Sequence, residues 1–284
     1  MLTRRKFVQS ITAGVAATLM INPINSLEIK GRRKLGKLGY IEGIIGKELD
    51  ADWKSALKET VGYGYSEIEI GRYRGESAKS FLSYCNETGI KPVAGGTVFS
   101  KNIDEVNKSL NELNELDLKY AVLYWPWLGS GPFKLEDCKI SSEMLNNIGE
   151  ACKKQGLILC WHNHNKEFIA MEEGLPFDYL MNHTDKNLVK CEIDIYWTQK
   201  GGADPVNILK KYKDRYPILH MKDMAAGNEQ DFACPGSGII DFPSVLSEAA
   251  NQGIEHYFVE RDNVVNGLDC LKTSAQYLKN LNFI

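Results

Sequence analysis

Short apolar runs alternate with amphipathic stretches from Leu38 to the end of the chain. The runs are mostly four to eight residues long and rich in Ile, Val, Leu and Tyr, a pattern typical of strands buried on both faces. Strands are therefore expected at residues 38–45, 66–70, 92–95, 120–123, 157–162, 188–195, 218–222 and 257–260.

The stretches between these runs carry helix signals. Asp52 and Ser77 suit helix N-caps, Gly89 suits a helix end, and Pro205 and Pro243 suit a first helical turn. Helices are expected at 52–61, 77–88, 103–116, 141–155, 205–212, 243–252 and 268–281, with a weaker one at 176–182. Eight strand–helix units predict a single (β/α)8 TIM barrel over residues 34–284.

The longest irregular stretches, 125–140 and 223–241, both follow expected strands. In a parallel barrel such loops lie on the face that carries active sites, so both could cover a substrate. Trp125, Trp127 and Phe133 in the first loop could form a wall on which a sugar stacks, or could pack beneath the loop.

Composition agrees with one soluble barrel, since 284 residues with 43% hydrophobic and 25% charged positions can form a sizeable core. The net charge is −3, but residues 1–33 hold six basic residues and one acidic residue. The remaining 28 basic and 36 acidic residues give the rest of the chain a net charge of −8. An acidic body argues against nucleic acid as a partner.

Residues 1–33 are interpreted as an export signal and linker. A twin-arginine pattern at residues 3–8 precedes a weakly apolar run at 11–21, which is too short to span a bilayer comfortably. Cleavage is expected between residues 21 and 34, without a lipid anchor. The prediction is a periplasmic protein, not membrane-bound after signal removal; the alternative is a basic helix that stays attached.

The seven cysteines are odd in number and include no Cys-x-x-Cys pair. This spacing favours neither a zinc knuckle nor a disulfide framework, so the cysteines are expected to be small buried apolar residues. Free thiols fit poorly with an oxidising compartment, which weakens the case for export.

Four successive expected strands finish in His, Asp or Glu. Asp194, His220 and Glu260 end three of them, and the fourth leads into the segment 161–168, Trp-His-Asn-His-Asn-Lys-Glu-Phe. Because parallel strand ends open onto one barrel face, these residues should converge. Imidazole and carboxylate ligands suit a divalent cation such as Mn²⁺, Zn²⁺, Co²⁺ or Mg²⁺.

Strand alternation refines these assignments. Glu192 and Asp194 share one side of a strand, with Glu192 one layer deeper and expected to support the site. His220 and Lys222 also share a side. Lys222 could neutralise an enolate oxygen, hold a substrate hydroxyl, or form a salt bridge to a neighbouring carboxylate.

His162, His164 and Glu167 come from the densest cluster of polar groups. Either histidine could bind metal or act as a general base near neutral pH. Glu167 follows in the loop and could reach back to the cation, and the residues alone do not decide among the three. His183 and His256 are expected on the surface.

At these residues the chain resembles the xylose isomerase-like TIM barrel superfamily, the sugar phosphate isomerases and epimerases. The resemblance covers residues 38–281 and rests on segments 161–168, 192–197 with 202–206, and 219–224. It implies one divalent cation held from the last four strands, with Asp194, His220 and Glu260 as three ligands. Relatives place a Glu inside strand five; here Glu167 is the first choice for that role and His162 the substitute.

The resemblance implies a metal-dependent sugar isomerase or epimerase working through an enediolate, with Glu260, Glu167, His162 and His164 as candidate bases. Elimination from a 3-keto-glycoside, a lyase reaction, is the alternative, since the branch includes secreted relatives of that kind. A metallo-phosphoesterase and a non-catalytic periplasmic sugar-binding protein are further readings. A homo-oligomer is left open, and no phosphate-binding glycine motif is present.

Overall fold

The computed structural model describes residues 32–71 and 73–284, so the export segment expected at the N-terminus lies, up to residue 31, outside the described residues. Eight parallel strands close into a barrel in the order β1-β10-β7-β6-β5-β4-β3-β2, which confirms the predicted (β/α)8 fold. The strands are β1 (Gly39–Ile41), β2 (Glu67–Glu69), β3 (Lys91–Gly96), β4 (Tyr120–Leu123), β5 (Ile158–His162), β6 (Val189–Asp194), β7 (Ile218–Met221) and β10 (His256–Val259).

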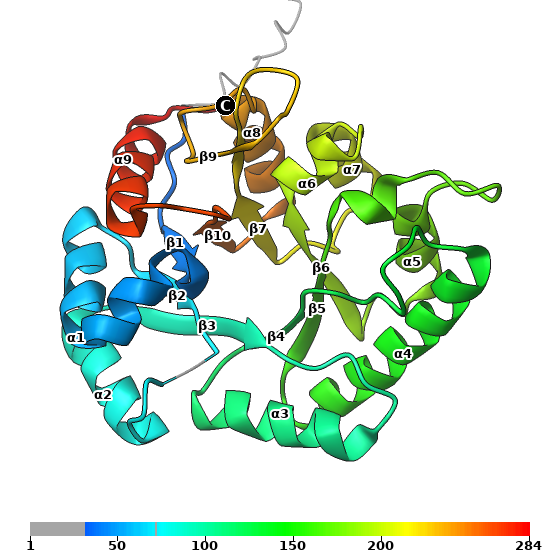
Figure 1. Ribbon diagram of the computed structural model, residues 1–284, viewed down its shortest axis with the longest axis horizontal. Helices are drawn as coiled ribbons and strands as arrows, with labels where there is room; N and C mark the ends of the chain where they lie inside the picture. The colour runs from blue at the N-terminus through cyan, green and yellow to red at the C-terminus, as the bar shows by residue number, and fades with distance from the viewer. Residues whose placement is uncertain (1–31, 72) are drawn as a thin grey trace, which may run out of the picture. The chain divides into compact units, whose positions relative to one another are not determined.

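Helices surround the barrel, as Figure 1 shows. They are α1 (Gly46–Tyr63), α2 (Ala78–Thr88), α3 (Ile103–Glu115), α4 (Leu135–Lys154), α5 (Pro176–His183), α6 (Ile195–Lys200), α7 (Pro205–Lys211), α8 (Phe242–Gln252) and α9 (Gly267–Asn280). Within the described part of the chain, no helix has the length and apolar character needed to cross a membrane.

Strand alternation divides the apolar side chains into two cores. The larger lies between the strands and the surrounding helices. The smaller fills the barrel interior and includes Val122, Cys160, Ile218 and Phe258. Side chains two residues further along β5, β7 and β10 share the interior side, and these are His162, His220 and Glu260. The polar strand ends therefore cap an apolar interior.

Two predicted boundaries are wrong near the N-terminus of the barrel. The strand expected to reach residue 45 ends at Ile41, and a 3-10 helix (Glu42–Ile45) leads into α1. Asp52 still behaves as a cap, because its carboxylate accepts the Ser55 N–H at 3.1 Å and its backbone is non-helical. The cap signal therefore marks a kink inside α1 rather than its start.

The two loops over the C-terminal ends of the strands are more regular than expected, and the first is also shorter. Helix α4 begins at Leu135, where Asp137 accepts the Lys134 N–H at 2.9 Å. The second loop contains a small antiparallel pair, β8 (Asp223–Met224) and β9 (Phe232–Ala233).

The Asp223 carboxylate organises the loop that follows β9. It accepts backbone N–H groups from Gly236, Gly238 and Ile240 at 2.8–3.1 Å. A Cβ on Gly238 would lie 2.3 Å from the Asp223 carboxylate, so the close approach requires glycine there.

A disulfide joins Cys234, in the loop after β9, to Cys270 in α9. The expectation that every cysteine is an unpaired apolar residue is therefore wrong for these two. The other five are free and buried, as predicted: Cys85, Cys138, Cys152, Cys160 and Cys191.

His256 also differs from its predicted surface position. It begins β10, is 6% exposed, and its Nδ1 lies 2.9 Å from the Glu67 carboxylate of β2. Because Glu67 is buried as well, this pair satisfies two polar groups at the end of the barrel away from the strand C-termini. His183 is exposed, as expected.

Candidate metal centre

Four side chains from four successive barrel strands meet at the strand C-termini. His162 ends β5, Asp194 ends β6, His220 lies in β7 and Glu260 follows β10. One ligand atom from each lies within 4.8 Å of the others. All four are buried or nearly so, the most exposed being Glu260 at 9%. The cluster contains three of the four predicted metal ligands, with His162 in the fourth place.

Strand register explains the convergence. Asp194 of β6 is directly paired with His220 of β7, so the two lie in one layer of the barrel. Asp194 is also the N-cap of α6, and its Oδ1 accepts the Trp197 N–H at 2.8 Å. The chain turns from strand to helix at this residue, which fixes the carboxylate at the barrel mouth.

Two deeper carboxylates hold the imidazole rings from behind. Glu192 Oε2 lies 3.2 Å from His162 Nδ1, and Glu192 Oε1 lies 2.8 Å from His220 Nε2. Glu69 Oε2 also lies 2.8 Å from His220 Nε2. Carboxylates in such positions orient metal-binding histidines and increase their basicity. The supporting role predicted for Glu192 matches these contacts.

Glu69 was not among the predicted site residues. It ends β2, in the segment Glu67–Glu69, where an apolar residue separates two carboxylates. The same pattern, a strand finishing in a charged residue, identified the other positions. Glu69 was not predicted because the expected site drew its residues from the last four strands. Closure of the barrel brings β2 to the same interior.

Lys222 supplies a buried positive charge beside the cluster. Its Nζ lies 3.0 Å from Glu260 Oε1, 3.7 Å from Asp194 Oδ2 and 2.6 Å from Asp262 Oδ2. The rings of Tyr196, Trp197 and Phe232 surround the same ammonium group at 4.8–5.6 Å. Of the roles considered for Lys222, the salt bridge is the one these contacts support.

Burial and charge shift the pKa values of the cluster in opposite directions. Burial raises the pKa of Asp194 to about 8, although Lys222 opposes the shift. Burial and Glu69 raise the pKa of Glu192 well above its ordinary value. Burial would also raise the pKa of Glu260, but Lys222 and His220 hold it well below its usual range.

The imidazoles respond differently because their neighbours differ. Burial lowers the pKa of His162 well below its ordinary value, and the nearby His220 adds to that effect. Burial would lower the pKa of His220 too, but Glu192, Glu69 and Glu260 raise it well above that value.

The residues present fit a divalent cation. In this buried group four carboxyl groups (Glu69, Glu192, Asp194 and Glu260) outnumber two cationic groups, the Lys222 ammonium and the His220 imidazolium. Asp194 Oδ2 is buried without a hydrogen-bond donor and belongs to the four-residue cluster. A carboxyl group with a raised pKa keeps its proton while no cation is bound, and it releases that proton when a cation binds. Mixed imidazole and carboxylate donors suit Zn²⁺, Mn²⁺ or Co²⁺ better than Mg²⁺, which prefers oxygen ligands alone.

Glu167 lies outside this cluster. Its segment forms a short 3-10 helix (Asn165–Phe168), which turns the carboxylate back toward the protein. Oε1 accepts the Trp127 Nε1–H at 3.0 Å, and Oε2 accepts the His164 backbone N–H at 3.0 Å. Glu167 was the first choice for the fourth ligand; the geometry instead favours the substitute, His162.

The buried Glu167 carboxyl provides a pH-dependent prediction. Burial raises its pKa from 4.5 to about 7, against the hydrogen bonds from Trp127 and His164. Its stabilising contribution is therefore full below pH 4.5 and is lost as the pH rises through 7. Between pH 4.5 and 8, the unfolding free energy of metal-free wild type should fall relative to Glu167→Gln by about 3 kcal/mol. Urea unfolding across that range measures the difference, and a constant difference would contradict the assignment.

A cavity of about 580 Å³ opens above the cluster at the barrel mouth. Its lining includes the cluster members His162 and Glu260, together with His164 and Glu69. Tyr124 lines it as well and donates its hydroxyl to Glu69. The cavity volume is in the range of small-molecule sites, so a ligand could reach the cluster.

His164 lines this cavity without belonging to the cluster. Its ring lies 4.9 Å from that of His162 and contacts Trp125, Trp127 and Trp197. Burial lowers its pKa to about 4, so the imidazole is neutral at neutral pH. Its Nδ1 atom is buried and has no hydrogen-bond partner. A ligand in the cavity would therefore meet the neutral ring of His164 but not its buried Nδ1 atom.

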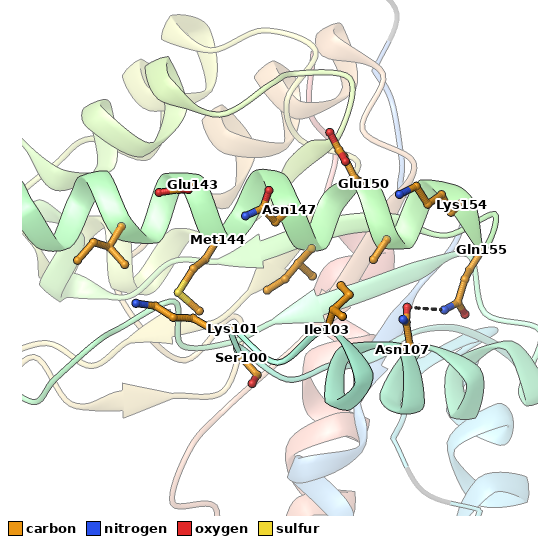
Figure 2. Close-up of a pocket in the computed structure, with 13 residues that line it drawn as sticks. Ser100, Lys101, Ile103, Asn107, Glu143, Met144, Asn147, Glu150, Lys154 and Gln155 are labelled. Atoms are coloured by element: carbon orange, nitrogen blue, oxygen red, sulfur yellow. Dashed lines mark hydrogen bonds between the residues drawn. The ribbon is translucent and has the colours of Figure 1, made fainter.

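A second hollow, of about 630 Å³, lies on the outer wall between α3 and α4 (Figure 2). Its lining mixes apolar residues such as Ile103 and Met144 with both signs of charge, and Gln155 bonds Asn107 across it at 3.2 Å. None of the described residues that line it is His or Cys. The metal-binding potential is at the barrel mouth instead.

Fold and site together define a TIM barrel whose polar mouth carries a cluster of possible metal ligands. Residues 56–281 match the model of the xylose isomerase-like TIM barrel family, and the chain belongs to that family. The resemblance seen in the sequence is thereby confirmed.

Individual relatives agree with this membership. The chain is 28% identical over 164 residues to an inosose dehydratase of Clostridium perfringens, a match that covers 51% of this chain and 54% of that protein. It is 26% identical over 229 residues to an inosose dehydratase of Geobacillus kaustophilus, a match that covers 68% of this chain and 74% of that protein. The chain thus spans about half the length of the first of these curated relatives.

A solved structure of similar shape is a sugar phosphate isomerase/epimerase from Parabacteroides distasonis. It superimposes with a TM-score of 0.74 at 25% identity, over 87% of this chain and 94% of that one.

Proposed function

We propose that this chain is a divalent-metal-dependent enzyme that removes a proton next to the carbonyl group of a sugar or a related polyhydroxylated ketone. The observation that carries the proposal is the cluster of His162, Asp194, His220 and Glu260 beneath an open cavity. A divalent cation bound by these groups would polarise the carbonyl and stabilise the charge left when the neighbouring C–H loses its proton.

The chain's own residues supply the proton transfer. A base must face the substrate within hydrogen-bond reach. His164, Glu69 and Glu260 line the cavity, but Glu69 is held by Tyr124 and His220, and Glu260 by Lys222 and His220. His162 Nδ1 is directed at Glu192, and Glu167 is bonded to Trp127 and His164. Of the predicted bases, we therefore favour His164, which lines the cavity as a neutral imidazole.

The fate of the proton decides the reaction. Its return to the opposite face gives epimerisation, and its return to the neighbouring carbon gives isomerisation; these two reactions were the first expectation from the sequence. Loss of a hydroxyl or glycosidic oxygen from the next carbon gives elimination. Similarity to inosose dehydratases favours elimination, whereas similarity to a sugar phosphate isomerase/epimerase favours return of the proton. We favour elimination, with a 3-keto-glycoside or an inosose as the substrate class.

Exchange with solvent tests the proposal for all three outcomes at once. Purified protein loaded with Mn²⁺ is incubated in D₂O with free ketoses, an inosose and 3-keto-glycosides, and NMR follows the carbon-bound protons. We expect deuterium at the carbon next to the carbonyl, or an enone product where elimination occurs. If the protein binds no metal and no compound exchanges, the sugar-binding protein is the better interpretation.

A further inference from the structure

Trp125 differs from the other tryptophans of the chain. Its side chain is 59% exposed, whereas the other four are buried or half-buried. It lies in the loop between β4 and α4 and lines the cavity together with His162 and His164. Of the aromatic wall suggested by the sequence, Phe133 is buried and Trp127 is bonded to Glu167. Trp125 is left as the ring that faces outward.

The backbone around Trp125 is fixed on both sides. Tyr124 donates its hydroxyl to Glu69, and the Pro126 carbonyl accepts the Ser141 hydroxyl at 2.9 Å. Further along the loop, the Gly129 carbonyl accepts a hydrogen bond from Lys166. An exposed indole on a loop held in this way is presented in one place, which lowers the entropy cost of binding a ligand against it.

The rings of His162, His164 and Trp125 form a row that begins at the four-residue cluster. The His162 and His164 rings are 4.9 Å apart, and the His164 and Trp125 rings are stacked 6.1 Å apart. Trp125 is therefore one ring further out than His164, beyond the space next to the cluster. Other parts of the cavity lining are polar and include Lys47, Arg261 and Asn263. An aromatic face with hydrogen-bonding groups nearby suits a sugar ring, which has apolar C–H faces and polar edges.

We propose that Trp125 is the platform of a second subsite, which binds the pyranose ring joined to the reacting ring by a glycosidic bond. The preferred ligand is then a two-ring glycoside rather than a free monosaccharide. This inference rests on the proposed function for the position of the reacting ring at the cluster. Trp125 makes no contact with the four cluster residues among the ring contacts of the described chain, so its role is in binding and specificity.

Binding of unreactive sugars tests the subsite without any turnover. The full chain loaded with Mn²⁺ is titrated with methyl β-D-glucoside, cellobiose and trehalose, with calorimetry for affinity and saturation-transfer NMR for the ring in contact. We expect at least one disaccharide to bind about tenfold more tightly than the methyl glucoside, the gain typical of one aromatic contact. Trp125→Ala should remove that preference, and Trp125→Tyr should retain most of it.

Leu128→Ala is the matched control, because Leu128 is exposed in the same loop and does not line this cavity. It should leave every affinity unchanged. The subsite is ruled out if Trp125→Ala binds all three sugars as wild type does, if it loses both sugar classes equally, or if no disaccharide is preferred. The subsite would stand but the proposed function would fail if the disaccharide preference depends on Trp125 while the protein binds no metal and catalyses no proton exchange.

Discussion

Replacement of His162 with alanine is expected to lower the affinity for the divalent cation by at least about 100-fold and to abolish proton exchange. The reason is geometric, since His162 Nε2 lies 3.8 Å from Asp194 Oδ2 while its Nδ1 is held by Glu192. Loss of the imidazole removes one of the two nitrogen donors of the cluster. Metal content after dialysis against a chelator measures the change.

Glu167→Gln is the matched comparison, because Glu167 was the competing ligand and its carboxylate is bonded to Trp127 and His164 instead. This variant should keep its metal. The reverse pattern, with metal lost from Glu167→Gln and retained by His162→Ala, would show that the segment 162–167 adopts a different arrangement around the ion.

Replacement of Lys222 with methionine is expected to destabilise the metal-free protein by about 3–5 kcal/mol at neutral pH. Lys222 is fully buried and forms close ion pairs with Glu260 and Asp262. Methionine keeps the apolar contacts with the aromatic rings but leaves the buried Glu260 carboxylate without its ammonium partner. Urea unfolding in the presence of a chelator measures the loss.

Lys211→Met provides the control for removal of an ion pair. Lys211 pairs with Asp178 at 2.8 Å, but its side chain is 51% exposed, and exposed pairs contribute at most about 1 kcal/mol. Equal losses for the two variants would mean that Lys222 does not balance buried charge. Addition of Glu260→Gln to Lys222→Met should recover part of the stability, because the unpaired charge is then removed.

The barrel and most of its site could be predicted because both follow from local patterns. Short apolar runs separated by capped helices fix eight strand–helix units, and parallel strands place their C-terminal residues on one face. Asp194, His220 and Glu260 each end such a run, so their convergence needed no knowledge of tertiary contacts.

The fourth ligand could not be settled in this way because it depends on the turn after β5. A carboxylate is a natural metal ligand, but the 3-10 helix directs Glu167 to the backbone of His164. The sequence does hold one indication that Glu167 turns toward His164, since a Glu three residues after a helix N-cap position is typical of a capping box. The contact of Glu69 with His220 depends on barrel closure, which brings β2 near β7 although the two strands are far apart in the sequence.

The disulfide between Cys234 and Cys270 could not be predicted from the sequence either, because spacing alone does not determine which cysteines pair. Disulfides persist in oxidising compartments. One disulfide beside five free thiols does not decide the compartment, and export stays a prediction because residues 1–31 lie outside the described part of the chain.

The same bond has a topological effect on the last part of the barrel. Together with the backbone from Cys234 to Cys270 it closes a covalent ring that contains α8, β10 and Glu260. A protease cut at any single peptide bond inside this ring would leave both fragments tethered. Glu260 would thus remain attached to the part of the chain that carries His162, Asp194 and His220, even in a nicked molecule.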